Sequence, residues 1–469
     1  MRVAFAAVAT LLAGLLPLAA HASTEGTAGH TSAFPLVFLF IVIMLMMARV
    51  GALAERFRQP AVLGELLMGL LLAALACLPG LDGIRELAGS ELVIGIAEIG
   101  VILLLFRTGL ESNIEEMRAV GLQAMLVAVV GVVLPFIGGY LVSKLLVPGL
   151  DSHTYVFFGA VLTATSVGIT ARVYKDLNVL KHKESQIVLG AAVIDDVLGL
   201  IILAVVSGIV TAGTVHASTI AVLCVKALAF LALAVVAGKL LAPRLGLWFS
   251  HIHSGVGMKM SLAVAICALF AWAAAALAGL APIVGAFAAG LVLDPVHFDR
   301  FRKPQIAVRI RDWCVRLRGC PADGRLTEVT KEMDESAHLE EDQHVENLIE
   351  GVGNFFIPIF FVYTGLQVNL AAFADPKTVG IALAITLVAI LGKALAGYAA
   401  GRGVRHKLIG FGMVPRGEVG LIFANVGRQL GVINDQMFAV AIIVVILTTM
   451  VTPPILGHLI GKQAPAAAQ

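Results

Sequence analysis

Residues 185–210 read SQIVLGAAVIDDVLGLIILAVVSGIV. As a helix this stretch is long enough to cross about 30 Å of hydrocarbon, and its only charged residues are Asp195 and Asp196, near its middle. A charged side chain at mid-bilayer costs several kcal/mol, so a carboxylate pair there is a candidate functional site. Adjacent helical residues point about 100° apart. One Asp can therefore face a neighbouring helix while the other faces a water-filled cavity.

The composition indicates that much of the remaining chain also lies in a membrane. Of 469 residues, 59% are hydrophobic and 14% are charged, whereas a soluble domain carries about 25% charged residues. The net charge of +2 gives no indication of a nucleic-acid partner. The five cysteines are scattered and mostly lie in apolar runs, which argues against a disulfide framework. We expect no cofactor and no resident metal.

Apolar runs of membrane-spanning length recur along the whole chain with short polar breaks between them. Such a pattern is typical of an all-α polytopic membrane protein, here with about thirteen transmembrane helices. The runs lie near 34–53, 60–78, 91–109, 121–147, 154–172, 185–210, 217–241, 258–278, 280–295, 352–372, 378–400, 408–430 and 436–460.

These runs divide the chain into segments. Residues 1–22 have the pattern of a signal peptide that ends in Ala20-His21-Ala22; the alternative is an uncleaved first membrane helix. The other segments are a periplasmic N-terminus at 23–33, helices one to nine at 34–295, a charged insertion at 296–350, helices ten to thirteen at 351–461 and a tail at 462–469.

The distribution of Lys and Arg sets the orientation. Loops on one side hold most of these residues, among them Arg56, Lys183 and Lys407, and such loops are typically cytoplasmic. We therefore expect a multi-pass protein of the bacterial inner membrane, with a periplasmic N-terminus and a cytoplasmic C-terminus. The insertion is basic in its first part and acidic in its second. It is either a solvated linker or carries an amphipathic helix around Trp313 that lies on anionic lipid.

The chain also repeats itself. Thr108-Gly109-Leu110, at the end of the third run, matches Thr364-Gly365-Leu366, late in the tenth. In the second run Pro60, Gly64 and Gly69 are echoed by Pro282, Gly285 and Gly290 in the ninth. Matching runs are seven apart, an odd number, so the two halves would have opposite orientations. Inverted repeats of this kind are a recurring plan of secondary transporters.

Further polar residues interrupt apolar runs. Lys393 lies in the eleventh run, where it could pair with a buried carboxylate or serve as a static strut. The fifth run contains LTATSVGIT at 162–170, and the twelfth contains MVPRGEVG at 413–420. Pro415 cannot donate a backbone hydrogen bond and glycines loosen a helix. Broken helices at bilayer depth are tolerated around a cavity, where carbonyl groups can ligate a cation.

Over residues 34–460 the chain resembles bacterial sodium/proton antiporters of the monovalent cation:proton antiporter-2 family. The acidic pair is one of the features that carry the resemblance. The others are Gln59-Pro60 with Gly64-Glu65 and Gly69, Pro358-Ile359-Phe360-Phe361 with Thr364-Gly365-Leu366, and Pro415-Arg416-Gly417-Glu418. The charged insertion and the signal peptide depart from the family pattern.

The resemblance implies a dimerisation domain and a mobile core domain that contains two crossed, broken helices. It also implies a homodimer. In the core, Asp196 would bind the ion and Asp195 would pair with Lys393 in the ion-free state. An acidic pair is typical of electrogenic family members. Supporting residues at the crossing would be Thr165, Ser166, Arg416 and Glu418.

The sequence thus predicts a secondary transporter that exchanges Na⁺ or Li⁺ for protons across the membrane. Each carboxylate would bind either a proton or a cation, so that one gradient drives the other. A K⁺/H⁺ antiporter of the same family and a cation channel or sensor are the alternatives. An intramembrane aspartyl protease is disfavoured, because Asp195 and Asp196 are adjacent on one helix and cannot converge on one water molecule.

Overall fold

A computed structural model describes most of the membrane-spanning part of the chain. The described residues are 34–57, 59–79, 81, 83–111, 121–176, 179, 182–212, 217–252, 255–293, 309–310, 313–314, 333 and 344–461. The expected signal peptide, the N-terminal segment 23–33, the C-terminal tail and nearly all of the insertion before residue 344 lie outside these residues. The predictions made for them stay predictions.

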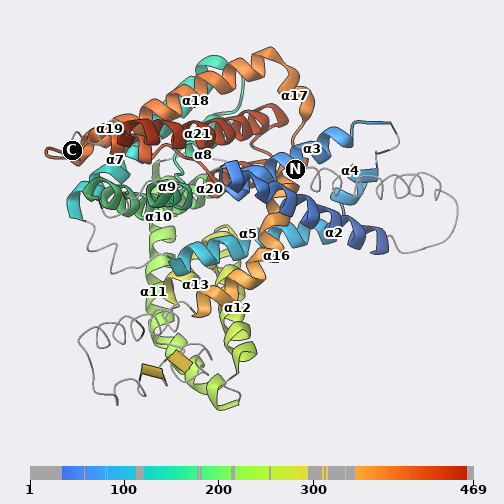
Figure 1. Ribbon diagram of the computed structural model, residues 1–469, viewed down its shortest axis with the longest axis vertical. Coiled ribbons are helices and arrows are strands. Elements are labelled where there is room, and N and C mark those ends of the chain that lie inside the picture. The colour runs from blue at the N-terminus through green and yellow to red at the C-terminus, as the bar shows by residue number, and fades with distance from the viewer. Residues whose placement is uncertain are drawn as a thin grey trace. The chain divides into compact units, whose positions relative to one another are not determined.

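The described elements are helices throughout, as expected from the apolar runs (Figure 1). Eight of them are long and apolar enough to cross a membrane, and α3 and α13 are shorter apolar helices. The main helices are α2 (Phe34–Gly51), α3 (Ala61–Leu75), α4 (Gly83–Ala88), α5 (Glu91–Glu111), α7 (Gly121–Leu146), α8 (Ser152–Val161), α9 (Val167–Asp176), α10 (Lys183–Ala212), α11 (Ala217–Ile252), α12 (Val256–Ala273), α13 (Pro282–Val292), α16 (His344–Leu366), α17 (Leu370–Ala374), α18 (Pro376–Ala396), α19 (His406–Gly412), α20 (Glu418–Gln429) and α21 (Asp435–Gly461).

Each of the thirteen expected runs falls on one of these helices or on a pair of shorter ones. The helix that contains the tenth run, α16, is longer than the apolar pattern indicated. It begins at His344 rather than near residue 352. Val345 and Ile349 are buried in a cluster with Phe106 and Leu262. This packing extends the helix into residues that the sequence assigned to the insertion.

Two of the runs are broken in the middle. The fifth run forms α8 and α9, separated by residues 162–166, and the twelfth forms α19 and α20, separated by residues 413–417. Prolines elsewhere do not interrupt their helices: Pro135 lies inside α7 and Pro358 inside α16. The breaks therefore follow from the local sequence together with the contacts described below, and not from proline alone.

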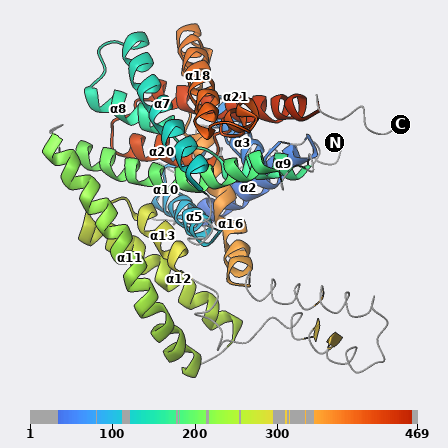
Figure 2. The same ribbon diagram turned by 90° about the vertical axis from the view of Figure 1, so that its left-hand side faces the viewer.

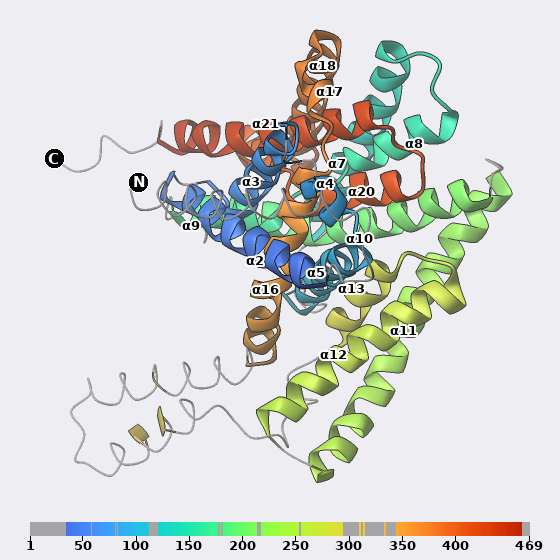
Figure 3. The same ribbon diagram turned by 90° about the vertical axis from the view of Figure 1, so that its right-hand side faces the viewer.

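The chain divides into two compact units. The first contains residues 1–101, 114–225 and 356–469, and the second contains residues 102–113 and 226–355. In the first unit α7 packs against α8, α10 and α18, and α18 packs against α21 (Figure 2). In the second unit α12 packs against α13 (Figure 3).

The helix α18 illustrates how the sequence sets an end point. Pro376 occupies its first turn, where the missing N–H is not needed. The Asp375 carboxylate caps the helix by accepting from the N–H groups of Lys377 and Thr378 at 3.2 Å each. The Thr378 hydroxyl donates to the same carboxylate at 2.8 Å. This hydroxyl, followed by the Lys377 amide, lowers the pKa of Asp375 below its usual value.

Glycines of the repeated motifs make equivalent contacts in both units. In the first unit a Cβ on Gly69 would lie 2.1 Å from the Val362 carbonyl oxygen, and one on Gly365 would lie 2.3 Å from that of Leu66. In the second unit the corresponding distances are 2.3 Å from Gly109 to Phe287 and 2.2 Å from Gly290 to Phe106. Only glycine permits such close backbone approach. In each unit, motif glycines of one repeat thus pack against the backbone of the other repeat.

Candidate functional site

The centre of the site is a buried ion pair between α10 and α18. Lys393 Nζ lies 3.2 Å from both Oδ1 and Oδ2 of Asp195, and both side chains are 0% exposed. The two residues are 198 positions apart in the chain. A buried ion pair survives because each charge compensates the desolvation of the other.

The Lys393 side chain lies beside α7 at Gly131. A Cβ on Gly131 would lie 3.7 Å from Lys393 Nζ, so the side chain lies against the backbone of this helix. On the same face, a Cβ on Gly392 would lie 3.1 Å from the Pro135 ring. The close packing of α7 and α18 therefore holds the ammonium next to Asp195.

Asp196 follows Asp195 on α10 and is 6% exposed as a residue, whereas Asp195 is 1% exposed. The ion pair occupies Asp195 on the side that faces α18. Asp196, rotated about 100° around the helix, retains the small accessible surface. Both carboxylates are thus buried, and Asp196 lies outside the ion pair with Lys393.

The two breaks meet beside α10. The N–H group of Ser166 donates to the Pro415 carbonyl oxygen at 2.9 Å, and the Thr165 hydroxyl lies 3.3 Å from the Met413 carbonyl oxygen. Arg416 Nη1 donates to the Ala164 carbonyl oxygen at 3.0 Å. Backbone groups released by one break are thus bonded by the other, as a membrane interior requires.

Arg416 brings a second positively charged side chain, beside that of Lys393, to this crossing. Its residue is 1% exposed, and its charge interacts with that of Asp195. Among the described residues, its Nε and Nη2 groups have no hydrogen-bond partner. The guanidinium therefore lies between the broken helices and α10, with donors that are not used by the fold.

Thr165 connects the crossing to the ion pair. Its hydroxyl donates to the Met413 carbonyl oxygen at 3.3 Å and also lies within reach of the Asp195 carboxylate. A threonine hydroxyl has one proton, so it can donate to only one of these acceptors at a time.

The last two expected site residues are placed at the same crossing. Ser166 is 1% exposed, and a Cβ on Gly417 would lie 2.8 Å from its Oγ, so glycine allows this approach. Glu418 is the first residue of α20. Its side chain lies outside the described part of the structure, and its expected role stays a prediction.

Several residues at the crossing were not predicted as site residues, although Thr170 belongs to the hydroxyl-rich stretch 162–170. The Thr170 hydroxyl donates to the Gly412 carbonyl oxygen at 2.7 Å, and the Tyr174 hydroxyl donates to that of Leu408 at 3.3 Å. The Thr449 hydroxyl of α21 donates to the Arg416 carbonyl oxygen. Buried hydroxyl side chains among apolar residues are the only signal that could have identified them.

The chemistry that this arrangement can perform is competitive binding of cations and protons. Two carboxylates, a lysine ammonium and carbonyl groups of broken helices lie together in a buried place. Carboxylate and carbonyl oxygens are ligands for hard cations, and carboxylates bind protons as well. Within the described residues, no group of three or more His, Cys, Asp or Glu side chains could hold a metal ion.

The fold and the site define a secondary transporter of cations. The family model described as "Sodium/hydrogen exchanger, transmembrane" matches residues 39–309 and 329–461. The chain therefore belongs to the sodium/hydrogen exchanger family, a family of transporters that exchange cations for protons.

Its curated relatives carry matching names. The chain is 35% identical to the "High-affinity Na(+)/H(+) antiporter NhaS3" of Synechocystis sp., over 95% of this chain and 94% of that protein. It is 32% identical to the "Na(+)/H(+)-K(+) antiporter GerN" of Bacillus cereus, over 92% and 97%. The resemblance to bacterial sodium/proton antiporters that the motifs indicated is confirmed.

The fold is also similar to that of a solved structure. The sodium proton antiporter MjNhaP1 from Methanocaldococcus jannaschii matches with a TM-score of 0.62 at 18% identity, over 92% of this chain and 98% of that one. At this identity the match concerns the fold alone. The predicted all-α polytopic membrane fold is confirmed.

Proposed function

We propose that this protein exchanges Na⁺ or Li⁺ for protons, electrogenically and by alternating access, with Asp196 as the residue that binds the cation. The observation that carries the proposal is the buried Asp195–Lys393 pair next to Asp196 at the crossing of two broken helices. This constellation combines a cation ligand with groups that can hold protons, in surroundings where uncompensated charge is costly.

The proposed cycle follows from charge compensation. In the ion-free state Lys393 neutralises Asp195, and Asp196 is accessible to a proton or a cation. A cation that enters between the carboxylates competes with Lys393 for Asp195. An ammonium deprived of its carboxylate in apolar surroundings gives up its proton readily. Binding of the cation therefore releases protons, and their return on the opposite side of the membrane expels the cation.

Potassium is the second candidate substrate. The relative from Bacillus cereus is named a Na⁺/H⁺-K⁺ antiporter, and the same carboxylate chemistry can bind either ion. The pair of carboxylates does not itself discriminate by ion size. The flux measurement must therefore compare the two ions directly.

The topology and assembly are part of the proposal. The N-terminus would lie in the periplasm and the C-terminus in the cytoplasm of a bacterial cell, as the Lys and Arg distribution indicates. The protein would work as a homodimer with a dimerisation domain and a mobile core domain. The family resemblance supports the homodimer and its division into these two domains.

The test is proton and cation flux in proteoliposomes, with Na⁺ and K⁺ supplied separately and the membrane voltage clamped. We expect Asp196→Asn to abolish exchange of either ion and to leave the protein folded, because removal of a buried charge relieves desolvation. Asp151→Asn is the matched control, since Asp151 is exposed and its side chain makes no cap hydrogen bond. Full exchange by Asp196→Asn would remove Asp196 from the site.

A further inference from the structure

The loop that follows α18 concentrates positive charge at one end of that helix. Residues 401–407 read GRGVRHK. Gly401 and Gly403 have φ angles of 76° and 86°, a conformation that glycine adopts most readily. They turn the chain sharply between η4 (Gly397–Ala400) and α19, so that Arg402 and Arg405 in the turn lie close in sequence to Lys407 in the first turn of α19.

Two of these charges are not compensated within the described part of the chain. Arg405 is paired, because its Nε lies 3.3 Å from Glu184 Oε1 and its N–H donates to the same oxygen. Arg402 and Lys407 are exposed, and neither forms an ion pair with a described residue. This segment therefore presents two cationic side chains that can bind an anionic ligand.

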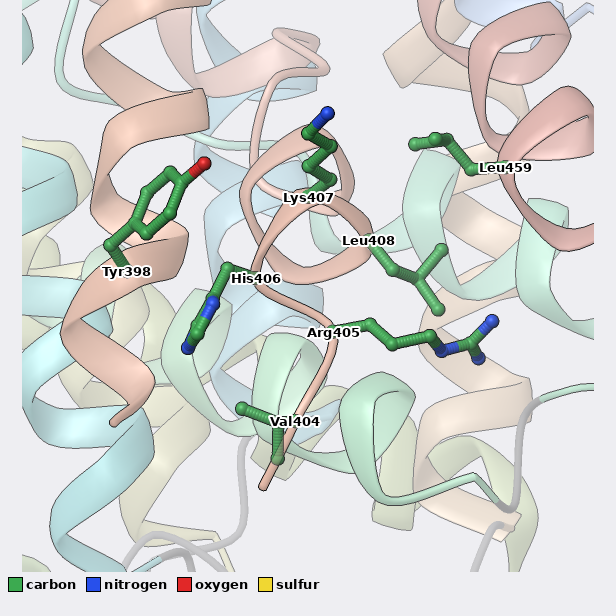
Figure 4. A pocket seen from close by; sticks show the side chains of 7 residues that line it. All are labelled: Tyr398, Val404, Arg405, His406, Lys407, Leu408 and Leu459. Atoms are coloured by element: carbon green, nitrogen blue, oxygen red, sulfur yellow. The ribbon is translucent and has the colours of Figure 1, made fainter. Parts of the chain in front are cut away.

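A hollow of about 350 Å³ opens at this loop (Figure 4). Tyr398 and His406 form one part of its wall, with ring centroids 5.0 Å apart and planes tilted by 22°. The His406 Nε2 donates to the Gly401 carbonyl oxygen at 2.6 Å, which fixes the ring. The remaining lining is basic or apolar and includes Arg405, Lys407, Leu408 and Leu459. None of the lining residues is acidic.

An apolar stripe leads along α18 to this hollow. Leu383, Leu387, Leu391 and Leu395 recur every four residues, which places them on one face of the helix, and they are 54%, 58%, 50% and 54% exposed. Because α18 is long and apolar enough to span the membrane, this face meets acyl chains. Tyr398, 56% exposed, follows the last leucine. Tyrosine is enriched at the depth where acyl chains give way to headgroups.

We propose that this hollow binds the phosphate headgroup of an anionic phospholipid, with an acyl chain along the leucine stripe. Lys407 in the wall of the hollow and Arg402 in the preceding turn supply the charge. Tyr398 marks the headgroup depth, and the exposed leucines supply the apolar contact. The site lies on the side of the membrane that the proposed topology makes cytoplasmic, where basic clusters attract anionic lipid. It is separate from the buried ion pair.

The opposite end of α18 shows why the charge decides the occupant. A hollow of about 440 Å³ there is lined by Lys377 together with apolar residues and Gln436. The Asp375 carboxylate lies at that end and accepts from the Lys377 N–H group. At the other end of α18 the Glu184 carboxylate is paired with Arg405, which leaves Arg402 and Lys407 without an ion pair among the described residues. Only the second end complements an anionic headgroup.

The test is native mass spectrometry of the full-length protein in detergent with added phosphatidylglycerol, phosphatidylcholine of the same chains, or inorganic phosphate. We expect the protein to bind phosphatidylglycerol in preference to phosphatidylcholine. Arg402→Gln/Lys407→Gln should weaken phosphatidylglycerol binding by about 25-fold, because each basic residue near an anionic surface contributes about five-fold. Lys144→Gln/Lys377→Gln, which removes two exposed charges at the other end of α7 and α18, should leave it unchanged.

Three results would overturn the proposal. Equal phosphatidylglycerol binding by Arg402→Gln/Lys407→Gln and the parent protein would exclude this site. Competition by inorganic phosphate at the same affinity would identify a site for a soluble anion. A change in the oligomeric state of Arg402→Gln/Lys407→Gln, without a change in bound lipid, would identify the leucine stripe as an interface between chains.

A charge-conserving variant separates binding from folding. Arg402→Lys/Lys407→Arg keeps both charges and should keep the preference for phosphatidylglycerol. Both positions are exposed, so the melting temperatures of the lipid-free variants should match that of the parent. If the charge-conserving variant also lost the preference, the shape of the loop and not its charge would be responsible, and the proposal would fail.

Discussion

Substitution of Lys393 by glutamine tests whether the buried pair carries protons or only holds the fold. The ammonium lies 3.2 Å from both carboxylate oxygens of Asp195, and neither side chain is exposed. At an effective dielectric constant of about 20, charges at this distance attract by about 5 kcal/mol. Removal of one partner leaves the other buried and uncompensated, at a cost of about 3–5 kcal/mol.

The functional consequence follows from the charge count. With Asp195, Asp196 and Lys393 all exchanging protons, two protons can be exchanged for one monovalent cation, so that net charge moves in each cycle. Glutamine can donate a hydrogen bond to Asp195 but has no proton to release. We therefore expect Lys393→Gln to be either electroneutral or inactive.

The assay is the current per transported cation on a solid-supported membrane, together with the melting temperature of the purified variant. Asp195→Asn/Lys393→Gln is the matched control, because it removes both charges and should recover stability that the single substitution loses. An unchanged electrogenic current in Lys393→Gln, accompanied by a lower melting temperature, would refute the coupling role. Lys393 would then be a structural strut.

Two further predictions concern packing and the insertion. Gly69→Ala would place Cβ 2.1 Å from the Val362 carbonyl oxygen and should lose about 1–3 kcal/mol of stability; Gly95→Ala, which meets nothing within 4 Å, should not lower the melting temperature. Replacement of residues 296–343 by a short linker, which leaves α16 and its buried Val345 and Ile349 in place, should preserve exchange but change its dependence on pH or lipid. Identical pH and lipid profiles would make the segment a plain linker.

The membrane fold could be predicted because the hydrocarbon interior of a bilayer constrains the length and composition of each helix that crosses it. A span of about 30 Å of hydrocarbon requires about 20 apolar residues, and each expected run is found on a helix or a broken pair. The predicted start of α16 was wrong by several residues, because Val345 and Ile349 are buried by partners distant in sequence. Local hydropathy has no information on such partners.

The sequence also singled out the charged residues of the site, since charge inside a membrane needs a reason. It did not by itself pair Asp195 rather than Asp196 with Lys393; only the family resemblance indicated that choice. In the structure, Asp195 is the carboxylate of α10 that faces α18, and close packing of α18 on α7 at Gly392 accompanies its contact with Lys393.

What the sequence alone determined is thus the helical membrane class, the repeat motifs and the unusual residues. The tertiary structure decided which of them meet. The bonds from Thr170 to Gly412 and from Thr449 to Arg416 end on backbone carbonyl groups. Every residue carries such a carbonyl, so no side chain marks the acceptor. Only the crossing of two broken helices selects those carbonyls, because it alone exposes them and places a hydroxyl within reach.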